Sequence, residues 1–454
     1  MQLPARKIAP DRRGLDRDAI VARYRRNRAR TRALFALLDE DACYERPIAL
    51  RHPLVFYEGH LPAFSFNTLV RRALGGASID PRLEALFARG IDPHESQAAG
   101  ATAATAWPDR ESVRRFADEA DRRVIAALEN ADLEQPGHPL LERAEAVFAI
   151  LEHEAMHQET LRYLCHRLPL RRKRRPDGYA PRTAGAEPAQ AWIPVPAGRA
   201  RLGVAAGDAP FSWDNERPAY ETAVPAFAIE QHDTTNGSYL AFVEAGGYRE
   251  ARWWRDEDWA WVRRERIEHP AFWERVDGEW HWRGMFDSLP LPLSWPVYVS
   301  HAEASAYAKW RGAWLPSEAQ FQRACYGSDR PGPRRYPWGN EPPTAAQGVF
   351  GFDSWDPQPA GSHPAGRSAW GVEDLVGNGW EWTSTVFEPF PGFRPMPSYP
   401  EYSADFFDGA HSVLKGASPA TALELLRPSF RNWFRPRYPY VYATFRCARG
   451  GTGS

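Results

Sequence analysis

Apolar residues recur at helical spacing in four stretches of the first 170 residues of the chain. The pattern predicts helices over residues 10–45, 60–74, 110–128 and 139–168. The last stretch carries its apolar stripe from Leu140 to Leu164 without an interrupting glycine or proline. Four amphipathic helices joined by short or medium connections are typical of an up-and-down bundle, where metal sites form between facing helices.

After residue 190 the pattern changes to short apolar pieces broken by glycine, proline and aspartate. Two short helices are predicted there, one over residues 233–242 and one over 300–310, where Ser300 and Glu303 have capping-box spacing. The remainder should form short strands and ordered loops. The 19 tryptophans are concentrated in this half, and large side chains allow an irregular fold to bury apolar surface.

Together these patterns predict an α+β protein with two domains, as the length of 454 residues also suggests. We expect a helical bundle over residues 1–182, a linker rich in proline and alanine over 183–190, and a mixed domain over 191–454.

Composition excludes several classes of protein. The net charge of −1 argues against a nucleic-acid partner, and the basic run 171–175 is interpreted as a solvated linker surface. No apolar run is long enough to span a membrane, and the N-terminal residues lack a signal-peptide core. The four cysteines are scattered without a CxxC pair, which indicates a reducing compartment and no zinc ribbon. We therefore expect a cytoplasmic protein without a membrane partner.

Candidate chemistry is concentrated in the fourth helix. His153 and His157 lie one turn apart on the same face, so their imidazoles can bind one metal ion such as iron, copper, nickel or zinc. The flanking Glu152, Glu154 and Glu159 are candidates to orient these rings. A third ligand must come from elsewhere.

His60, expected at the start of the second helix beside Pro62, is the natural third ligand. The alternative is that none of the three binds a metal: a histidine at a helix start often caps the helix or packs in the core, and the two histidines of the fourth helix can share a face by chance.

The mixed half carries ordered phrases that resemble the formylglycine-generating-enzyme domain, a variant of the C-type-lectin fold. They are Asp214–Pro218, Thr235–Asn236, Gly246–Tyr248, Leu315–Ala319, Tyr336–Asn340, Asp374–Asn378, Trp380–Thr383 and Phe445–Cys447. The N-terminal half resembles a DinB-type four-helix bundle. In combination, the two halves resemble the iron-dependent sulfoxide synthases of ergothioneine biosynthesis (EgtB type).

The resemblance implies an O2-dependent oxidoreductase whose Fe(II) is held by His60, His153 and His157. It also implies that Asn432 and Trp433 bind hercynine, the trimethylammonium betaine of histidine, with the Trp433 ring facing the cation. Without the resemblance, Trp433 would be interpreted as a core residue.

The resemblance further implies a proton-donating phenol near the metal at Tyr399 or Tyr402. The residues alone do not choose between the two tyrosines, and either can be purely structural.

Three departures from the family pattern concern the substrates. Phe434 stands where some relatives have an acidic residue that binds a peptide thiol, and Met156 stands where some have glutamine. Residues 90–108 contain no arginine to pair with the carboxylates of γ-glutamylcysteine. We therefore include Phe434 and Met156 among the substrate-binding residues.

The phrase Phe56–Phe64 also resembles the selenoneine synthase (SenA) branch. That branch joins a selenosugar to the imidazole C2 of hercynine through a carbon–selenium bond. The alternatives are a sulfoxide synthase that uses cysteine or γ-glutamylcysteine, a thiol transferase of the DinB type, and a metal-stabilised sugar-binding module. Formylglycine-generating chemistry itself needs reactive cysteines near the C-terminus, where only Cys447 lies, in a phrase that reads as core.

Overall fold

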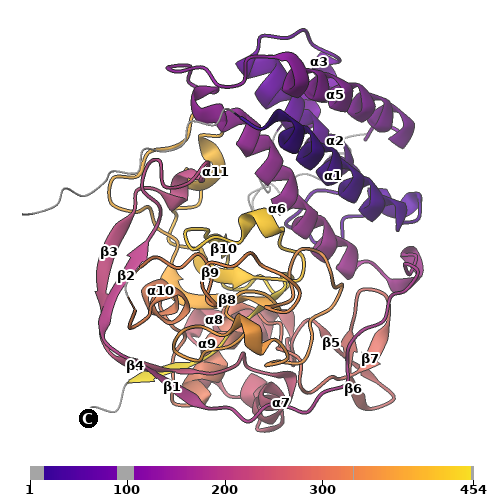
Figure 1. Ribbon diagram of the computed structural model, residues 1–454. Coiled ribbons are helices and arrows are strands. Elements are labelled where there is room, and N and C mark those ends of the chain that lie inside the picture. The colour runs from indigo at the N-terminus through magenta and orange to yellow at the C-terminus, as the bar shows by residue number, and fades with distance from the viewer. Residues whose placement is uncertain (1–14, 89–106, 331, 451–454) are drawn as a thin grey trace, which may run out of the picture.

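The computed structural model describes residues 15–88, 107–330 and 332–450 (Figure 1). The helices of the first 170 residues, drawn from indigo to purple, lie together above a region of sheets, loops and short helices that the rest of the chain forms. This arrangement confirms the predicted α+β fold with a helical domain before a mixed one. The exact domain boundaries remain predictions.

Four long helices build the first domain. They are α1 (Arg17–Ala36), α2 (Leu54–Ser65), α5 (Arg110–Asn130) and α6 (Glu145–Arg167). Helices α1 and α2 each pack against both α5 and α6, so the predicted four-helix bundle is confirmed. A π-helical segment, Phe66–Ala73, continues α2, and the short helix α3 (Pro81–Leu86) follows.

Helix α1 is shorter than the predicted 10–45, of which residues 10–14 lie outside the described residues. Asp16 caps its start by accepting a hydrogen bond from the amide of Ala19 (3.0 Å). The helix ends at Ala36 because Leu38 leaves it to pair as an isolated β-bridge with Lys173. A short 3₁₀ turn, Asp41–Tyr44, follows.

The same pairing corrects the interpretation of the basic run 171–175 as a solvated surface at one residue, Lys173; Arg171, Arg174 and Arg175 are exposed as expected. Lys173 is buried, and its ammonium group donates to the carbonyl of His166 (3.2 Å). Burial lowers the pKa of Lys173 to about 7.

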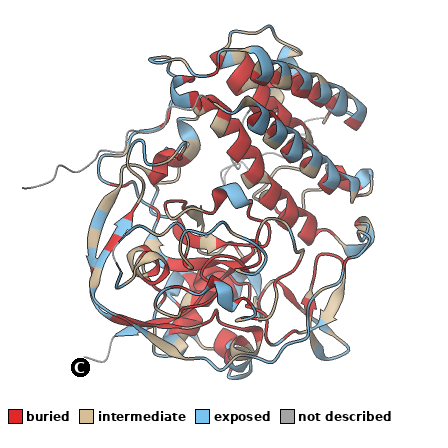
Figure 2. Cartoon of the chain, viewed as in Figure 1, coloured by how far each residue is buried: buried red, intermediate tan, exposed pale blue. Residues whose placement is uncertain are grey.

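Helix α6 runs between the two domains and is buried on almost every face (Figure 2). It begins at Glu145 rather than at the predicted Pro139, because Arg143 and Ala144 have positive φ angles of 54° and 55° that break the helix. A helix buried on all sides is typical of a core element rather than of a surface helix with one apolar face. Side chains from α6 therefore reach both domains.

The mixed domain contains four small sheets. The largest has the order β10-β9-β8-β11, with β8 (Gly379–Val386) and β9 (Ser412–Ala417) at its centre. The other sheets have the orders β1-β4-β12, β2-β3 and β5-β6-β7. The remaining strands are β1 (Trp192–Val195), β2 (Gly198–Leu202), β3 (Tyr220–Val224), β4 (Phe227–Glu230), β5 (Trp273–Val276), β6 (Glu279–Arg283), β7 (Ser288–Pro290), β10 (Asn432–Phe434), β11 (Ala443–Thr444) and β12 (Ala448–Gly450).

Short helices connect these strands. They are α7 (Asn236–Glu244), α8 (Asp256–Glu265), α9 (His301–Trp310), α10 (Glu318–Tyr326) and α11 (Glu401–Ala404). Both helices predicted in this half are confirmed as α7 and α9, and Ser300 and Glu303 form the predicted capping box at the start of α9.

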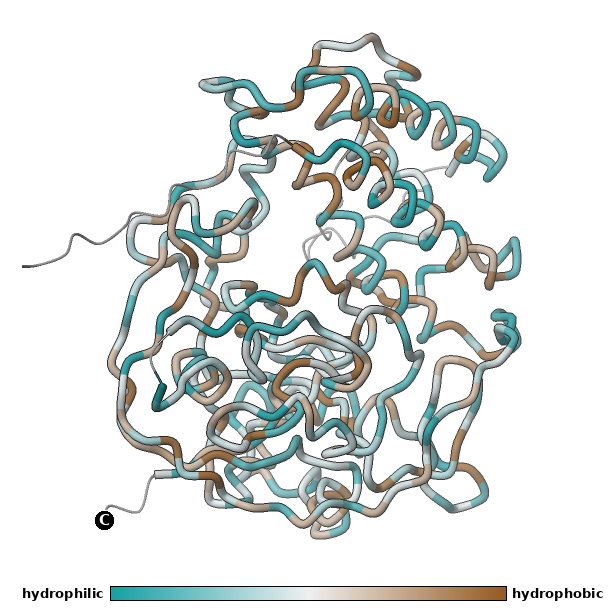
Figure 3. The backbone as a smooth tube through the Cα atoms, in the orientation of Figure 1, coloured by the Kyte–Doolittle hydropathy of each residue, from teal (hydrophilic) through white to brown (hydrophobic). Residues whose placement is uncertain are grey.

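Tryptophans fill the interior of the mixed domain, as its irregular pattern predicts. Hydrophobic stretches are short and alternate with hydrophilic ones along this region (Figure 3). Six tryptophans are among the largest side chains that are almost completely buried: Trp213, Trp273, Trp282, Trp295, Trp380 and Trp382. One hydrophobic cluster contains residues of both α6 and the central sheet, so the two domains share a core.

All four cysteines are buried and unpaired. In the described residues, no helix combines the length and the apolar character needed to cross a bilayer.

Three carboxylates of α6 fix this helix against its surroundings. Glu154 accepts from Arg28 and Thr31 of α1, at 2.8 and 2.7 Å. Glu152 pairs with both terminal nitrogens of Arg427 in the mixed domain, at 2.8 and 2.9 Å.

Glu159 accepts from the Trp380 indole (2.8 Å) and from the hydroxyls of Ser418 and Thr421 in the mixed domain. Buried charges must be paired or hydrogen-bonded, so these contacts determine where α6 can lie.

Replacing Arg427 with methionine should destabilise the protein by about 3–5 kcal/mol, because Glu152 and Glu216 both lose their buried cationic partner. Denaturant unfolding followed by tryptophan fluorescence measures this loss. The matched control is Arg115→Met, which removes an exposed pair with Glu111 and should cost less than about 1 kcal/mol. Equal stability of the two variants would contradict the anchoring role of Arg427.

Candidate metal centre and adjoining pocket

Helices α2 and α6 bring three histidines together. The ring centroid of His60 lies 5.1 Å from that of His153 and 5.2 Å from that of His157, and the two α6 rings are 4.5 Å apart. One ring nitrogen from each residue lies within 4.8 Å of the others. The three residues that the sequence singles out as metal ligands therefore form a cluster that can hold one ion.

The position of Pro62 suggested that His60 lies at a helix start, and this prediction was wrong. It lies inside α2, and Pro62 is an interior residue of the same helix. A proline there removes one backbone hydrogen bond and normally disfavours a helix. Here the segment is buried on nearly every side, and packing outweighs this local cost.

Backbone and aromatic contacts orient the imidazoles. The α6 carboxylates, which were predicted to orient them, instead bind side chains of α1 and of the mixed domain. His60 Nδ1 donates to the carbonyl oxygen of Phe87 (2.7 Å), which leaves Nε2 with a free lone pair. His153 stacks on Phe64 with ring centroids 3.6 Å apart. The prediction for Glu152, Glu154 and Glu159 was wrong because each has the distant partners described above.

A glycine makes the first of these contacts possible. A Cβ atom at Gly59 would lie 2.5 Å from the Phe87 ring, so Phe87 could not stay where its carbonyl binds His60.

Burial keeps all three imidazoles neutral. Desolvation lowers the pKa of His60 to about 4, and it holds the pKa values of His153 and His157 well below their usual range. Neutral imidazole is the form that binds metals.

The unpaired ring nitrogens are the strongest sign of a missing partner. Nε2 of His60, both nitrogens of His153 and Nδ1 of His157 are buried without a hydrogen bond. Buried polar atoms are rarely left unsatisfied, and a transition-metal ion would satisfy one nitrogen of each ring. Three ligands would also leave coordination positions free for other molecules.

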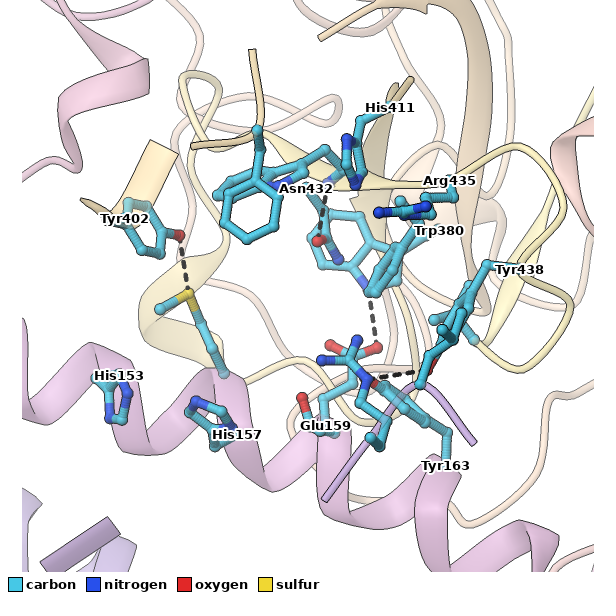
Figure 4. A pocket seen from close by; sticks show the side chains of 18 of the residues that line it. His153, His157, Glu159, Tyr163, Trp380, Tyr402, His411, Asn432, Arg435 and Tyr438 are labelled. Carbon is cyan, nitrogen blue, oxygen red and sulfur yellow. Dashed lines mark hydrogen bonds between the residues drawn. The ribbon is translucent and has the colours of Figure 1, made fainter. Parts of the chain in front are cut away.

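The cluster opens into a cavity of about 240 Å³ that lies between the domains (Figure 4). His153 and His157 form part of its wall. The six other residues singled out from the sequence also line it: Met156, Tyr399, Tyr402, Asn432, Trp433 and Phe434. The structure thus brings every predicted site residue to one centre or to the pocket beside it.

The two tyrosines occupy different positions. Tyr399 lies against α2 and α6, with its ring 5.3 Å from that of Phe64 and 6.1 Å from that of His153. Tyr402 donates its hydroxyl hydrogen to the sulfur of Met156 (3.2 Å). Burial raises the pKa of Tyr402 well above its usual value, so this phenol stays protonated.

Trp433 is partly a core residue and partly a pocket residue. One face stacks on Phe387, with centroids 4.3 Å apart and planes 5° apart. Its edge meets the Tyr402 ring at 5.2 Å, and it borders the cavity beside Asn432. The stacking on Phe387 holds the indole in a fixed orientation.

An aromatic wall, of which sequence reasoning identified only Phe434, also lines the cavity. Phe434 and Tyr438 stack with centroids 5.4 Å and planes 1° apart. The guanidinium of Arg51 lies over the rings of Tyr438, Tyr163 and Phe434, at 5.4, 5.6 and 6.0 Å. Arg51 also donates to the Tyr438 hydroxyl (2.9 Å). No local motif marks these residues, since they come from three distant parts of the chain.

Two protein families match the chain. The sulfatase-modifying factor enzyme 1-like domain matches residues 179–450, more than half of the chain, and the DinB superfamily matches residues 23–161. The chain belongs to the sulfatase-modifying factor enzyme 1-like family. The pairing of the two domains confirms the predicted membership of the EgtB-type superfamily, and the selenoneine synthase branch stays a prediction.

Three curated relatives illustrate this membership. "Hercynine oxygenase" of Mycolicibacterium thermoresistibile is 45% identical over 252 residues, which are 54% of this chain and 56% of the relative. "Ergothioneine biosynthesis protein 1" of Schizosaccharomyces pombe is 29% identical over 465 residues, covering 91% of this chain and 54% of the relative. "Formylglycine-generating enzyme" of Thermomonospora curvata is 29% identical over 311 residues, covering 59% of this chain and 96% of the relative. The matched regions span little more than half the length of the first two relatives.

Cys447 has the character of a core residue in this family member. It is completely buried, its amide donates to Glu230 (2.8 Å), and burial raises the pKa of its thiol well above the usual value. A thiol that stays protonated is a poor nucleophile.

Residues 90–106 of the segment that lacks arginines lie outside the described residues.

Replacing His60, His153 or His157 with alanine should each reduce bound Fe(II) from about one ion per chain to near zero, since two imidazoles rarely suffice for a stable site. Metal analysis after anaerobic loading and desalting measures the content. His301→Ala is the matched control, because His301 is a buried histidine that lies outside the cluster. Undiminished iron in any of the three variants would remove that residue from the ligand set.

Proposed function

We propose that this protein is an O2-dependent non-haem Fe(II) enzyme that forms a carbon–selenium bond between a selenosugar and the imidazole C2 of hercynine. The observation that carries the proposal is the cluster of three imidazoles, each with a buried nitrogen that makes no hydrogen bond, at the wall of a pocket that also contains Asn432 and Trp433. The relatives named for hercynine oxygenation and for ergothioneine biosynthesis support the choice of hercynine.

Three neutral imidazoles suit iron because they leave coordination positions open. When bound there, Fe(II) supplies electrons for the reduction of O2 and a Lewis-acidic centre for the chalcogen donor. His60, His153 and His157 hold the ion, and their orientation by Phe87 and Phe64 limits how far the centre can shift.

Asn432 and Trp433 orient hercynine. The electron-rich face of an indole fixed by Phe387 favours a trimethylammonium group, which offers no hydrogen bond of its own. The Asn432 amide can bind the carboxylate or the imidazole of the same molecule. Binding in a partly enclosed pocket also excludes water from the reacting atoms.

Tyr399 is the better placed of the two tyrosines to hold the proton that the reaction consumes. Its ring packs beside His153, whereas the hydroxyl of Tyr402 is directed at Met156. We infer that Tyr399 donates a proton near the metal and that Tyr402 borders the substrate.

The aromatic wall supports a sugar as the donor. Phe434 and Tyr438 supply aromatic rings at the pocket wall, the kind of group on which the apolar face of a sugar ring packs, while Arg51 and the Tyr438 hydroxyl can bind its hydroxyl groups. Two acidic side chains, Asp405 and Asp408, also line the pocket and would repel a donor with two carboxylates.

The second candidate is a sulfoxide synthase that uses cysteine or γ-glutamylcysteine. Arg51 is the observation that favours it, because a guanidinium in the pocket can pair with a carboxylate. A sugar-binding module with a structural metal is less well supported, since structural sites are normally closed by four protein ligands.

Replacing Trp433 with alanine should weaken hercynine binding by about 1–2 kcal/mol through loss of the cation–π contact. Calorimetry on the anaerobic Fe(II)-loaded protein measures the affinity. Trp314→Ala is the control, because Trp314 is 45% exposed and does not line the pocket. Unchanged affinity of the Trp433 variant would return this residue to a purely structural role.

Donor preference should favour the sugar. We expect the Fe(II)-loaded protein, given O2 and hercynine with equal amounts of a selenosugar, a thiosugar, cysteine and γ-glutamylcysteine, to couple the selenosugar first, because the aromatic wall matches it. Mass spectrometry of the products measures the ratio. Preferential use of a peptide thiol would reject the selenoneine branch, and absence of any coupled product would reject the proposed activity.

A further inference from the structure

Met156 places a thioether sulfur beside the metal cluster. It lies on α6 between His153 and His157, is half-buried, and lines the pocket. Its sulfur accepts the hydrogen bond of Tyr402 at 3.2 Å. A thioether is a weak acceptor and a readily oxidised group, so this contact joins a soft atom to a substrate-binding wall.

The other described methionines are protected from oxidants. Met285 is 1% exposed and Met396 is completely buried in the core. Met1 lies outside the described residues. Oxidation of methionine depends on access to the sulfur, so among the described methionines Met156 is the one that a small oxidant in the pocket can reach.

Aromatic neighbours fix the ring of Tyr402, so its hydroxyl stays directed at the side chain of residue 156. Its ring stacks on Trp213 with centroids 4.0 Å apart and meets Trp433 edge-on at 5.2 Å. These contacts keep the hydroxyl directed at Met156. A sulfoxide oxygen at Met156 would be a much stronger acceptor than the sulfur and would add a polar atom to the pocket between His157 and Trp433.

We propose that Met156 is a reversible oxidation site that closes the hercynine pocket through its contact with Tyr402. The oxidant is a peroxide: the sulfur lone pair attacks one peroxide oxygen, the O–O bond breaks, and an S–O bond forms. The sulfur loses two electrons and hydrogen peroxide is reduced to water. A thiol-dependent methionine sulfoxide reductase reverses the step, returning the oxygen as water.

The evidence for the oxidation site is the accessibility of Met156 and its hydrogen bond with Tyr402. The effect of oxidation on hercynine binding rests on the proposed function. Replacement of the weak bond by a strong one fixes the phenol on α6 and narrows the space beside Trp433. Oxidation therefore lowers the affinity of the pocket for its acceptor substrate without touching the three imidazoles.

The first experiment treats the metal-free full chain with hydrogen peroxide in the presence of a chelator and follows the peptides of Met156, Met285 and Met396 by mass spectrometry. We expect the Met156 peptide to gain one oxygen several-fold faster than the other two. Equal or slower oxidation of Met156 would overturn the site.

A second arm tests the contact with Tyr402. Tyr402→Phe removes only the hydroxyl, which frees the sulfur lone pair, so Met156 should be oxidised faster than in the wild type. An unchanged rate would overturn the role of the pair.

A third arm measures hercynine affinity by calorimetry before peroxide, after peroxide, and after reductase treatment. We expect peroxide to lower the hercynine affinity of the wild type several-fold and reductase treatment to restore it. In the Met156→Leu protein, the treated and untreated samples should bind hercynine with the same affinity. An equal loss in the Met156→Leu protein would overturn the proposal. If the untreated wild type binds no hercynine, the proposed function fails, while the mass measurement still decides the oxidation site.

Discussion

The position of helix α6 is the constraint on which the rest of the structure depends. This helix is buried on almost every side, yet it carries three carboxylates that cannot be left without partners. Glu154 is satisfied by α1, whereas Glu152 and Glu159 are satisfied by the mixed domain. These bonds hold the helix in one place between the domains, and two of the candidate metal ligands, His153 and His157, lie among them.

These bonds to α6 also stabilise the fold around the histidine cluster, which by itself destabilises the metal-free protein. Three desolvated imidazoles with unpaired nitrogens do not stabilise the metal-free protein. The shared core and the carboxylate anchors offset this cost, and they leave the ring nitrogens available for an ion. The same anchors bring Asn432 and Trp433, from a strand nearly three hundred residues away in the sequence, to the wall of a pocket that begins at His157.

The sequence predicted well what depends on local periodicity. The helical stripe around His153 and His157 places both rings on one face, and Ser300 with Glu303 marks a helix start that the structure contains. Prediction failed where long-range packing decides. Pro62 suggested a helix start at His60, but burial keeps the helix intact through it.

The pocket shows the same limit of sequence reasoning. The glutamates of α6 stand next to the histidines in the sequence, but their partners in the fold are distant arginine, threonine, serine and tryptophan side chains. Asn432 and Trp433 were found through family resemblance, since no spacing rule connects them to α6. Arg51, Tyr163 and Tyr438 were missed because they meet only through tertiary packing.

The central claim is that one ferrous ion binds between α2 and α6 through three imidazoles. X-ray absorption spectroscopy of the anaerobic Fe(II)-loaded protein tests it most directly, because the multiple scattering of imidazole rings reports how many histidines bind the iron. The account predicts three imidazoles per iron and no sulfur ligand. A spectrum with fewer imidazoles, or with sulfur from Met156 or a cysteine in the coordination sphere of the metal-loaded protein, would contradict it.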